Sequence, residues 1–487
     1  MLRAVLFLVA IAAAWQATAP ALDEFVAASS ADEKVAKAAL EKIAVGWKDS
    51  YTSMFVDMAR LMRAPRRPFQ QPDAPSPTAD DERTVFGPER PSSDPLDVPD
   101  RGSPSRRRLI TFLAKQTGQR FGDDLTAWRD WMWKLPYEPH PEYATLKGLL
   151  YGQIDPRMRA FFPPGVQTTI RLDEIDWGGV TVNGIPPLRD PKTVSAGDAS
   201  YLKDSHVVFG IVENGEARAY PKRILAWHEM AIDRVGGVDL TIVYCTLCGT
   251  VIPFESRANG RLFRFGTSGL LYRSNKLMFD EETNSLWSTF EGVPVVGSLV
   301  GSGVALQSHP VVTTTWKEWR TEHPETRVLS LDTGFSRDYS EGAAYRDYFS
   351  TDRLMFQVSE TDARLRNKAE VLVMQLPDSS TRDRRIPVAI DAQFLQRHRV
   401  YQFDVGQHGY LVVTSDRGAN RVYRVEEKFA EQPGSAPVRD REGRVWIVTE
   451  SGLNLEGELT TRRPRVAAQR AFWFGWYAQF PETILIK

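Results

Sequence analysis

The stretch Thr241-Ile242-Val243-Tyr244-Cys245-Thr246-Leu247-Cys248-Gly249-Thr250 holds both cysteines of a 487-residue chain. A short β-branched and apolar segment precedes them, and a second apolar run follows Gly249. This order predicts a strand, a tight turn and a second strand. A C-x-x-C motif that opens a helix gains thiolate stabilisation from the helix N-terminus. Here the residues favour a sulfur-bearing knuckle between two strands.

A C-x-x-C-G hairpin is typical of a metal knuckle, in which two thiolates bind one ion and turn amides point at sulfur. Two thiolates are half of a tetrahedral site, so Cys245 and Cys248 need further ligands. The nearest candidate is His228, on a short helix expected over 221–232. Glu229 adjoins it but would point elsewhere on a helix. Copper and zinc both suit thiolates, and the sequence does not separate them.

Two other interpretations of the cysteine pair stay open. The pair can be a redox-active dithiol, with His228 as a proton partner. It can also be a structural disulfide in a binding or scaffold protein. A thiol–disulfide oxidoreductase is a further reading, although the helix that usually activates the attacking thiol is missing. No catalytic residue is assigned, and whether the chain is an enzyme stays open.

The N-terminus indicates export. Met1-Leu2-Arg3 is a short positive region, and an apolar segment follows over 4–15. Ala19-Pro20-Ala21 is an A-x-A cleavage site, so residues 1–21 are expected to be a signal peptide. The apolar segment is too short to span a bilayer, and no transmembrane span is expected in the mature chain. The predicted location is the bacterial periplasm, where two thiols tend to pair unless metal or a reductant holds them.

Composition excludes one class of partner. Lys plus Arg total 61 and Asp plus Glu total 62, so the chain has no basic field for nucleic acid. A small molecule or a protein remains the expected partner, without a chemical identity.

The pattern along the chain predicts an α+β protein with a small α-helical N-terminal domain and a β-rich C-terminal domain. Helical spacing and composition place helical segments at 22–63 and 109–164. The Trp-rich stripe around Trp128 and Trp131 is interpreted as core between these helices. Residues 64–108 are rich in Pro, Asp, Ser and Arg and are expected to be a linker. Short apolar segments separated by turn residues make 165–487 a β-rich domain.

Several further motifs in one order resemble a bacterial family known as domain of unknown function 3179. They span roughly 170–485 and are Ala219-Tyr220-Pro221, Trp227-His228-Glu229, Tyr244 to Thr250, Phe265 to Tyr272, Ser274-Asn275, Asp280, Thr283, Ser285 to Ser288, Thr315-Trp316, His323-Pro324, Thr333-Gly334, Arg337, Tyr339, Asn367-Lys368 and Phe472-Trp473-Phe474. The family usually has Pro after the first cysteine, where this chain has Thr246. Because the family has no assigned activity, the resemblance supports the fold and the export of the chain more than its chemistry.

Four polar residues are expected to lie near the cysteines and to line a pocket: Tyr244, Ser268, Tyr272 and Asn275. Two glycines around Thr267-Ser268 do not have the spacing of a phosphate cradle. The segment from Asp280 to Trp287 is interpreted as turn chemistry with an anchoring Trp. Hydrolase signatures such as G-x-S-x-G and H-E-x-x-H are absent from the sequence.

Overall fold

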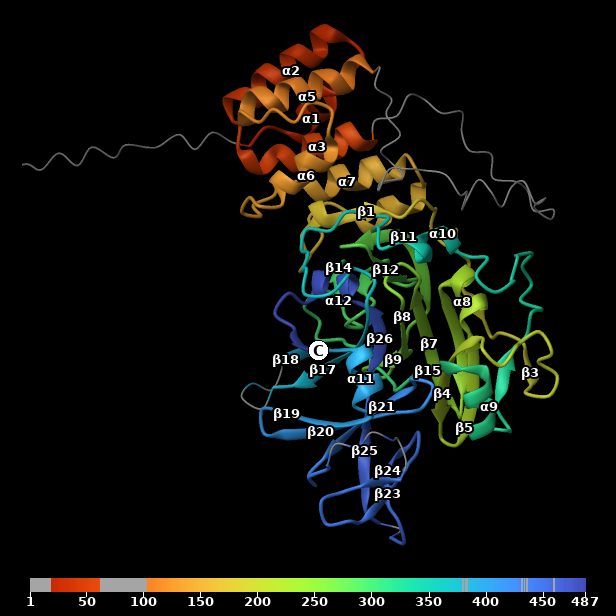
Figure 1. Ribbon diagram of the computed structural model, residues 1–487. Coiled ribbons are helices and arrows are strands. Elements are labelled where there is room, and N and C mark those ends of the chain that lie inside the picture. The colour runs from red at the N-terminus through yellow and green to blue at the C-terminus, as the bar shows by residue number, and fades with distance from the viewer. Residues whose placement is uncertain are drawn as a thin grey trace, which may run out of the picture. The chain divides into compact units, whose positions relative to one another are not determined.

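The computed structural model of the chain describes residues 19–61, 103–378, 384–430, 437–458 and 460–487, together with positions 381, 432 and 434. Helices dominate the N-terminal region and strands dominate the rest, so the protein is α+β as predicted (Figure 1). The described residues up to Leu146 form one compact unit, here called the helical unit. Those from Lys147 onward form a second, here called the β-rich unit.

The helical unit is built from short helices that bury one face each. They are α1 (Leu22–Ala28), α2 (Glu33–Val45), the 3₁₀ turn η1 (Asp49–Tyr51), α3 (Thr52–Leu61), α5 (Pro104–Thr117), α6 (Leu125–Met132) and the start of α7 (Tyr143–Gly152). The Trp128 side chain is fully buried and that of Trp131 is half-buried. The interpretation of the aromatic stripe as core is therefore confirmed for Trp128, whose indole donates to the Gly122 carbonyl at 3.0 Å.

The predicted end of the linker at residue 108 is wrong, because α5 begins at Pro104, inside the predicted linker. Proline is favoured in the first helical turn, where its missing N–H has no intrahelical acceptor to lose. The rest of the predicted linker, 64–102, lies outside the described residues, as does most of the predicted signal peptide. Within the residues that the structure describes, no helix is both long and apolar enough to cross a membrane.

The β-rich unit contains three sheets in its first half. One has the order β2-β6-β7-β8 and the next β1-β11-β12-β13-β14, while the third is β15-β4-β5-β16-β3. Their bounds are β1 (Ile175–Trp177), β2 (Leu188–Arg189), β3 (Thr193–Ser195), β4 (Val207–Glu213), β5 (Glu216–Pro221), β6 (Met230–Val235), β7 (Val238–Cys245), β8 (Thr250–Glu255), β11 (Phe265–Tyr272), β12 (Asn275–Asp280), β13 (Leu286–Ser288), β14 (Pro294–Val296), β15 (Val312–Thr315) and β16 (Arg327–Leu329).

Two further sheets follow, and a short ribbon pairs β9 with β10. In the sheet β26-β17-β18-β27, strand β26 lies beside β8 of the first sheet. The sheet β19-β20-β21-β25-β24-β23-β22 forms one end of the unit. Their bounds are β9 (Arg257–Ala258), β10 (Arg261–Leu262), β17 (Glu370–Pro377), β18 (Arg385–Asp391), β19 (Val400–Val405), β20 (His408–Thr414), β21 (Asn420–Val425), β22 (Val438–Arg439), β23 (Val445–Val448), β24 (Gly452–Leu455), β25 (Arg462–Val466), β26 (Gln469–Phe472) and β27 (Ile484–Ile486).

Short helices connect these strands. They are η2 (Pro156–Phe161), η3 (Leu172–Glu174), α8 (Lys222–His228), α9 (Trp316–Glu322), α10 (Arg346–Ser350), α11 (Ala392–Arg397) and α12 (Trp473–Gln479). The helix expected over 221–232 is wrong in its second half, because α8 ends at His228 and β6 starts at Met230. Glu229 adopts the left-handed conformation, with φ +54°, and so ends the helix without a glycine.

The predicted strand, turn and strand around the cysteines are confirmed. β7 ends at Cys245, β8 begins at Thr250, and these two residues face each other in the antiparallel pair. Gly249 closes the turn with φ +62°, and a Cβ on it would meet the Phe472 ring at 3.0 Å. Both its backbone conformation and its contact with Phe472 therefore require glycine.

Asp280 organises the turn between β12 and β13. Its buried carboxylate accepts hydrogen bonds from the Thr283 backbone N–H at 2.7 Å, from the Thr283 hydroxyl and from the Trp287 indole at 2.9 Å. The interpretation of this segment as turn chemistry with an anchoring Trp is confirmed. The turn matters for the site, because β12 also carries Asn275 and Lys276.

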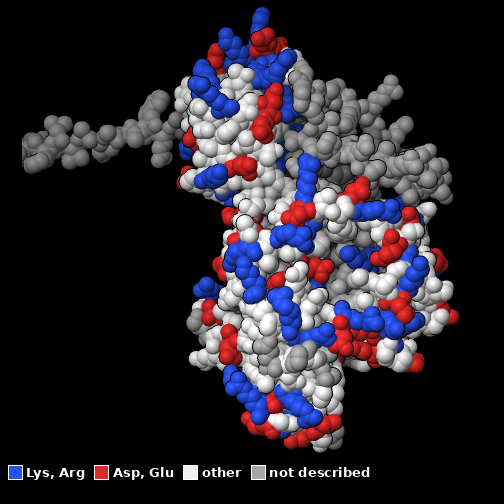
Figure 2. Space-filling view, in the orientation of Figure 1, with Lys and Arg blue, Asp and Glu red and all other residues white. Residues whose placement is uncertain are grey.

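Charges of both signs are interspersed over the face of the protein in Figure 2. This distribution agrees with the formal net charge of −1. On this face no extended basic surface suited to a phosphate backbone is present.

Candidate functional site

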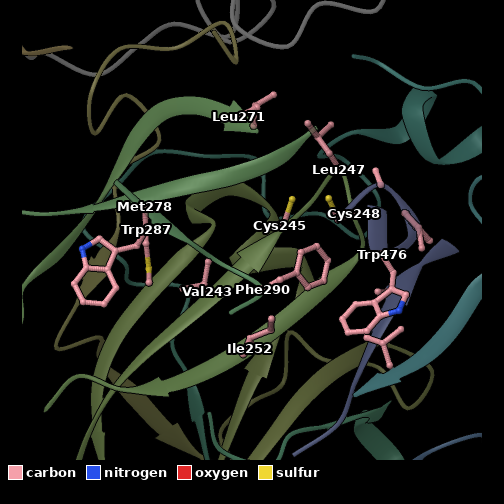
Figure 3. Close-up of a cluster of buried hydrophobic side chains, with 14 of the residues drawn as sticks. Val243, Cys245, Leu247, Cys248, Ile252, Leu271, Met278, Trp287, Phe290 and Trp476 are labelled. Carbon is pink, nitrogen blue, oxygen red and sulfur yellow. The ribbon is translucent and has the colours of Figure 1, made fainter. Parts of the chain in front are cut away.

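The two cysteines lie at opposite ends of a four-residue segment, 245–248, here called the dithiol turn. They are free thiols, they approach each other to 3.2 Å, and their exposed fractions are 2% and 0%. Figure 3 shows both sulfurs directed to the same side of the turn, among apolar side chains that include Leu247 and Leu271. A disulfide needs a sulfur–sulfur distance of about 2.05 Å. The turn therefore holds the sulfurs apart as thiols but close enough to join with a small movement.

Cys248 is held by three neighbours. The Asn275 amide donates to its sulfur at 3.4 Å, and its thiol donates to the Ser274 carbonyl at 3.4 Å. The Phe472 backbone N–H donates to its carbonyl at 2.7 Å, so β26 fastens the turn. Sequence reasoning predicted Asn275 as a neighbour of the cysteines, and the structure places it there.

The two thiols differ in proton affinity. Burial raises the pKa of Cys245, but the neighbouring Cys248 thiol and the backbone N–H groups of Lys276 and Cys248 outweigh it, so its pKa is lowered. Burial and the neighbouring Cys245 sulfur raise the pKa of Cys248 well above its ordinary value. Cys245 is thus the thiol that ionises first, and Cys248 keeps its proton.

A buried ion pair beside the turn was missed by sequence reasoning. The Lys276 ammonium donates to the Glu229 carbonyl at 2.8 Å and lies 3.4 Å from the Glu229 carboxylate. Both side chains are nearly fully buried, and burial lowers the pKa of Lys276. Glu229 reaches Lys276 because its left-handed backbone turns its side chain away from the course that a continued helix would give it. Glu229 therefore points away from His228, as expected, but its carboxylate meets Lys276 beside the dithiol turn.

Two tyrosines from the segment around α10 cover the dithiol turn. The Tyr348 hydroxyl donates to the Leu247 carbonyl at 2.8 Å, and the Tyr345 hydroxyl donates to the Glu229 carboxylate at 3.4 Å. The Lys368 ammonium lies 3.4 Å from the centre of the Tyr348 ring, which adds a cation–π contact to the cover. Nothing in the sequence near these tyrosines relates them to cysteines about 100 positions earlier.

His228 makes its own hydrogen-bond chain. Its ring nitrogens contact the Pro186 carbonyl at 2.9 Å and the Tyr339 hydroxyl at 2.5 Å, and Tyr339 in turn contacts the Thr333 hydroxyl at 2.7 Å. Burial lowers the pKa of His228 to about 4, so the ring is neutral at pH 7. Both nitrogens are occupied, which leaves no lone pair for a metal ion in this arrangement.

The predicted ligand set is not assembled around one point. Across the part of the chain that the structure describes, the only His, Cys, Asp and Glu side chains that bring three ligand atoms within 4.8 Å of one another are Glu322, His323 and Glu450. Cys245, Cys248 and His228 do not meet this condition. In the cluster that does, Glu450 is paired with Arg421 at 2.6 Å and with Arg465 at 2.9 Å, so its charge is already compensated.

The other predicted pocket residues lie in different surroundings. Tyr244 is on the opposite face of β7 from Cys245, with its ring 5.1 Å from that of Phe209 and its buried hydroxyl unpaired. The Ser268 hydroxyl donates to the Leu277 carbonyl at 2.6 Å, which ties β11 to β12. Tyr272 interacts with Glu174. Of the four, the structure shows only Asn275 in contact with a thiol.

A family model described as "Protein of unknown function (DUF3179)" matches residues 182–483. The matched region includes the dithiol turn, the Glu229–Lys276 pair and the covering tyrosines. No curated protein and no solved structure matches the chain.

Proposed function

Because the chain belongs to the DUF3179 family of proteins of unknown function, we propose its function from the site alone: Cys245 and Cys248 form a redox-active couple that alternates between a dithiol and a disulfide. The observation that carries this proposal is the approach of the two free thiols to 3.2 Å within one turn.

The difference between the two thiols fits such a couple. In a dithiol exchange, one thiolate attacks and the second thiol resolves the intermediate. The lowered pKa of Cys245 and the raised pKa of Cys248 assign the first role to Cys245 and the second to Cys248. Backbone N–H groups contribute to this difference in pKa between the two thiols. In a thioredoxin-like motif, a helix N-terminus has this role.

Charge balance also supports the couple. The Glu229 carboxylate and the Lys276 ammonium compensate each other in nearly fully buried surroundings. A disulfide and a fully protonated dithiol are both uncharged, so neither state adds a net charge to buried surroundings. The two end states of the cycle are therefore both compatible with burial.

A second proposal is that the two thiolates hold one copper(I) ion. Two soft sulfur donors shielded from water are what copper(I) binds readily, whereas structural zinc needs four donors. This form of the site would use Cys245 and Cys248 without His228, which differs from the set expected from sequence. Export to the periplasm remains part of both proposals, because the sequence predicts a signal peptide.

The experiment that separates these proposals is thiol counting with metal analysis on the full chain, purified without chelator and then reduced. We expect no stoichiometric metal, two free thiols per chain, and loss of both together on treatment with the thiol oxidant diamide. The Cys248→Ser variant should keep its single thiol or form a mixed adduct, because no resolving thiol remains.

Two results would contradict the redox proposal. About one copper ion per chain, lost in the Cys245→Ser/Cys248→Ser variant, would make the site a metal site. A disulfide that resists dithiothreitol until the chain is unfolded would make the pair structural, as a binding or scaffold protein requires.

A further inference from the structure

Three buried hydroxyl groups at the dithiol turn have no hydrogen-bond partner: those of Thr246, Thr250 and Ser274. Their side chains are at most 2% exposed. An unpaired buried hydroxyl lowers stability, and native proteins contain few of them. Their concentration at one turn indicates that something small and polar pairs with them.

The positions of these hydroxyls relate them to the sulfurs. Thr250 lies directly opposite Cys245 in the β7–β8 pair, so their side chains project from the same face of the sheet as close neighbours. Thr246 follows Cys245 in the turn, and the Ser274 carbonyl accepts the Cys248 thiol. Thr250 therefore neighbours Cys245 across the strand pair, while Thr246 and Ser274 adjoin Cys245 and Cys248 through the backbone.

The surroundings of the two sulfur atoms limit which molecule can bind there. Both sulfurs are buried, so a protein disulfide cannot reach them in this conformation. The molecule must be small and uncharged, and it must carry oxygen atoms that hydroxyl groups can pair with. It must also react with a thiolate, because Cys245 is the thiol that ionises first.

We propose that the dithiol turn binds and reduces a small hydroperoxide, with the hydroxyls of Thr250, Thr246 and Ser274 as its hydrogen-bond partners. This inference rests on the proposed redox couple and names the oxidant of that couple. The nearby Lys276 ammonium, which is electrostatically coupled to Cys245, stabilises the negative charge that develops on the departing oxygen.

The step balances with hydrogen peroxide as the oxidant. The Cys245 thiolate attacks one peroxide oxygen, a sulfur–oxygen bond forms, and the oxygen–oxygen bond breaks. The departing hydroxide takes up a proton and becomes water, which leaves Cys245 as a sulfenic acid. Cys248 then attacks this sulfur, the sulfur–sulfur bond forms, and a second water leaves. Both thiol protons end in the two waters, and a small-molecule dithiol, which becomes a disulfide, restores the reduced state.

The test is the rate at which hydrogen peroxide oxidises the reduced full chain, measured by stopped-flow tryptophan fluorescence at one fixed pH. We expect the folded chain to react at least about a hundredfold faster than the same chain unfolded in urea. The Thr250→Val variant should react about tenfold more slowly than wild type, because it lacks one of the paired hydroxyls. Thr267→Val is the matched control, since the Thr267 hydroxyl is already bonded to the Ile185 carbonyl at 2.8 Å.

Stability separates this role from a structural one. Because the Thr250 hydroxyl has no protein partner, replacing it by a methyl group should leave the melting temperature unchanged or raise it, while the reaction slows. If the Thr250 hydroxyl instead stabilised the fold, its removal would lower the melting temperature.

The inference is overturned if the folded and unfolded chains react with peroxide at the same rate, or if Thr250→Val reacts as fast as wild type. In either case, a reversible oxidation and reduction of Cys245 and Cys248 in dithiothreitol buffers would still support the redox couple. If neither peroxide nor diamide joins the thiols, the redox couple itself fails.

Discussion

Replacing Asp280 by alanine is expected to lower the free energy of unfolding of the β-rich unit by about 4 kcal/mol. The carboxylate is fully buried and accepts from the Thr283 backbone and hydroxyl and from the Trp287 indole. Alanine leaves these donors buried without an acceptor, and each unpaired donor costs about 1–3 kcal/mol. The measurement is the urea unfolding transition followed by tryptophan fluorescence.

Two variants make this test specific. Asp280→Asn keeps one carbonyl oxygen as an acceptor and should lose clearly less stability than Asp280→Ala. Asp204→Ala removes a carboxylate that is 52% exposed and paired with Arg320 at the surface, so its cost should stay within about 1 kcal/mol. Equal losses for Asp280→Ala and Asp204→Ala would show that the Asp280 turn does not organise β12 and β13.

The stability of the β-rich unit should fall as the pH drops from about 6.5 to about 4, in part because of His228. Burial lowers its pKa in the folded chain from 6.5 to about 4, so the unfolded chain takes up the proton first. Protonation then favours the unfolded state by about 1.4 kcal/mol per pH unit, or about 3 kcal/mol over the window. Above pH 6.5 this contribution to stability is complete.

The measurement compares the urea midpoints of wild type and His228→Gln from pH 4 to pH 8. The variant lacks the Pro186 and Tyr339 contacts of the imidazole and should be less stable at pH 7, but its stability should fall less steeply below pH 6.5. Parallel curves for wild type and His228→Gln would contradict a buried neutral His228.

Local patterns predicted several of the longer strands that build the β-rich unit. The alternating apolar segments at 240–244, 370–375 and 410–414 correspond to β7, β17 and β20. The turn between the cysteines was also predictable, because Gly249 and the β-branched residues around it are local signals. Each of these features depends on residues that are neighbours in sequence.

The composition of the site depends instead on contacts between distant segments. Lys276 lies on β12, and its ammonium meets Glu229 only because the sheets that hold β12 and β7 share one hydrophobic core. Tyr348 reaches the dithiol turn from α10. No periodicity or spacing in the sequence brings these three segments to one place.

Glu229 and His228 show a second reason why the site was harder to predict from the sequence than the strands. The sequence predicted one helix through both residues, and a continued helix would keep Glu229 away from the cysteines. The chain instead enters the left-handed region at Glu229, a conformation that non-glycine residues seldom adopt. This turn sends Glu229 to Lys276 and leaves His228 with Tyr339, so the ligand set predicted from sequence order is not assembled.

The most direct test of the redox couple is an equilibrium titration of the full chain in dithiothreitol buffers of graded potential, with free thiols trapped and counted at each point. The proposal predicts one reversible two-electron transition at Cys245 and Cys248, with a midpoint between about −270 and −120 mV, the range of redox-active dithiols. Two thiols that stay free at every potential, or a disulfide that persists below about −300 mV, would contradict it.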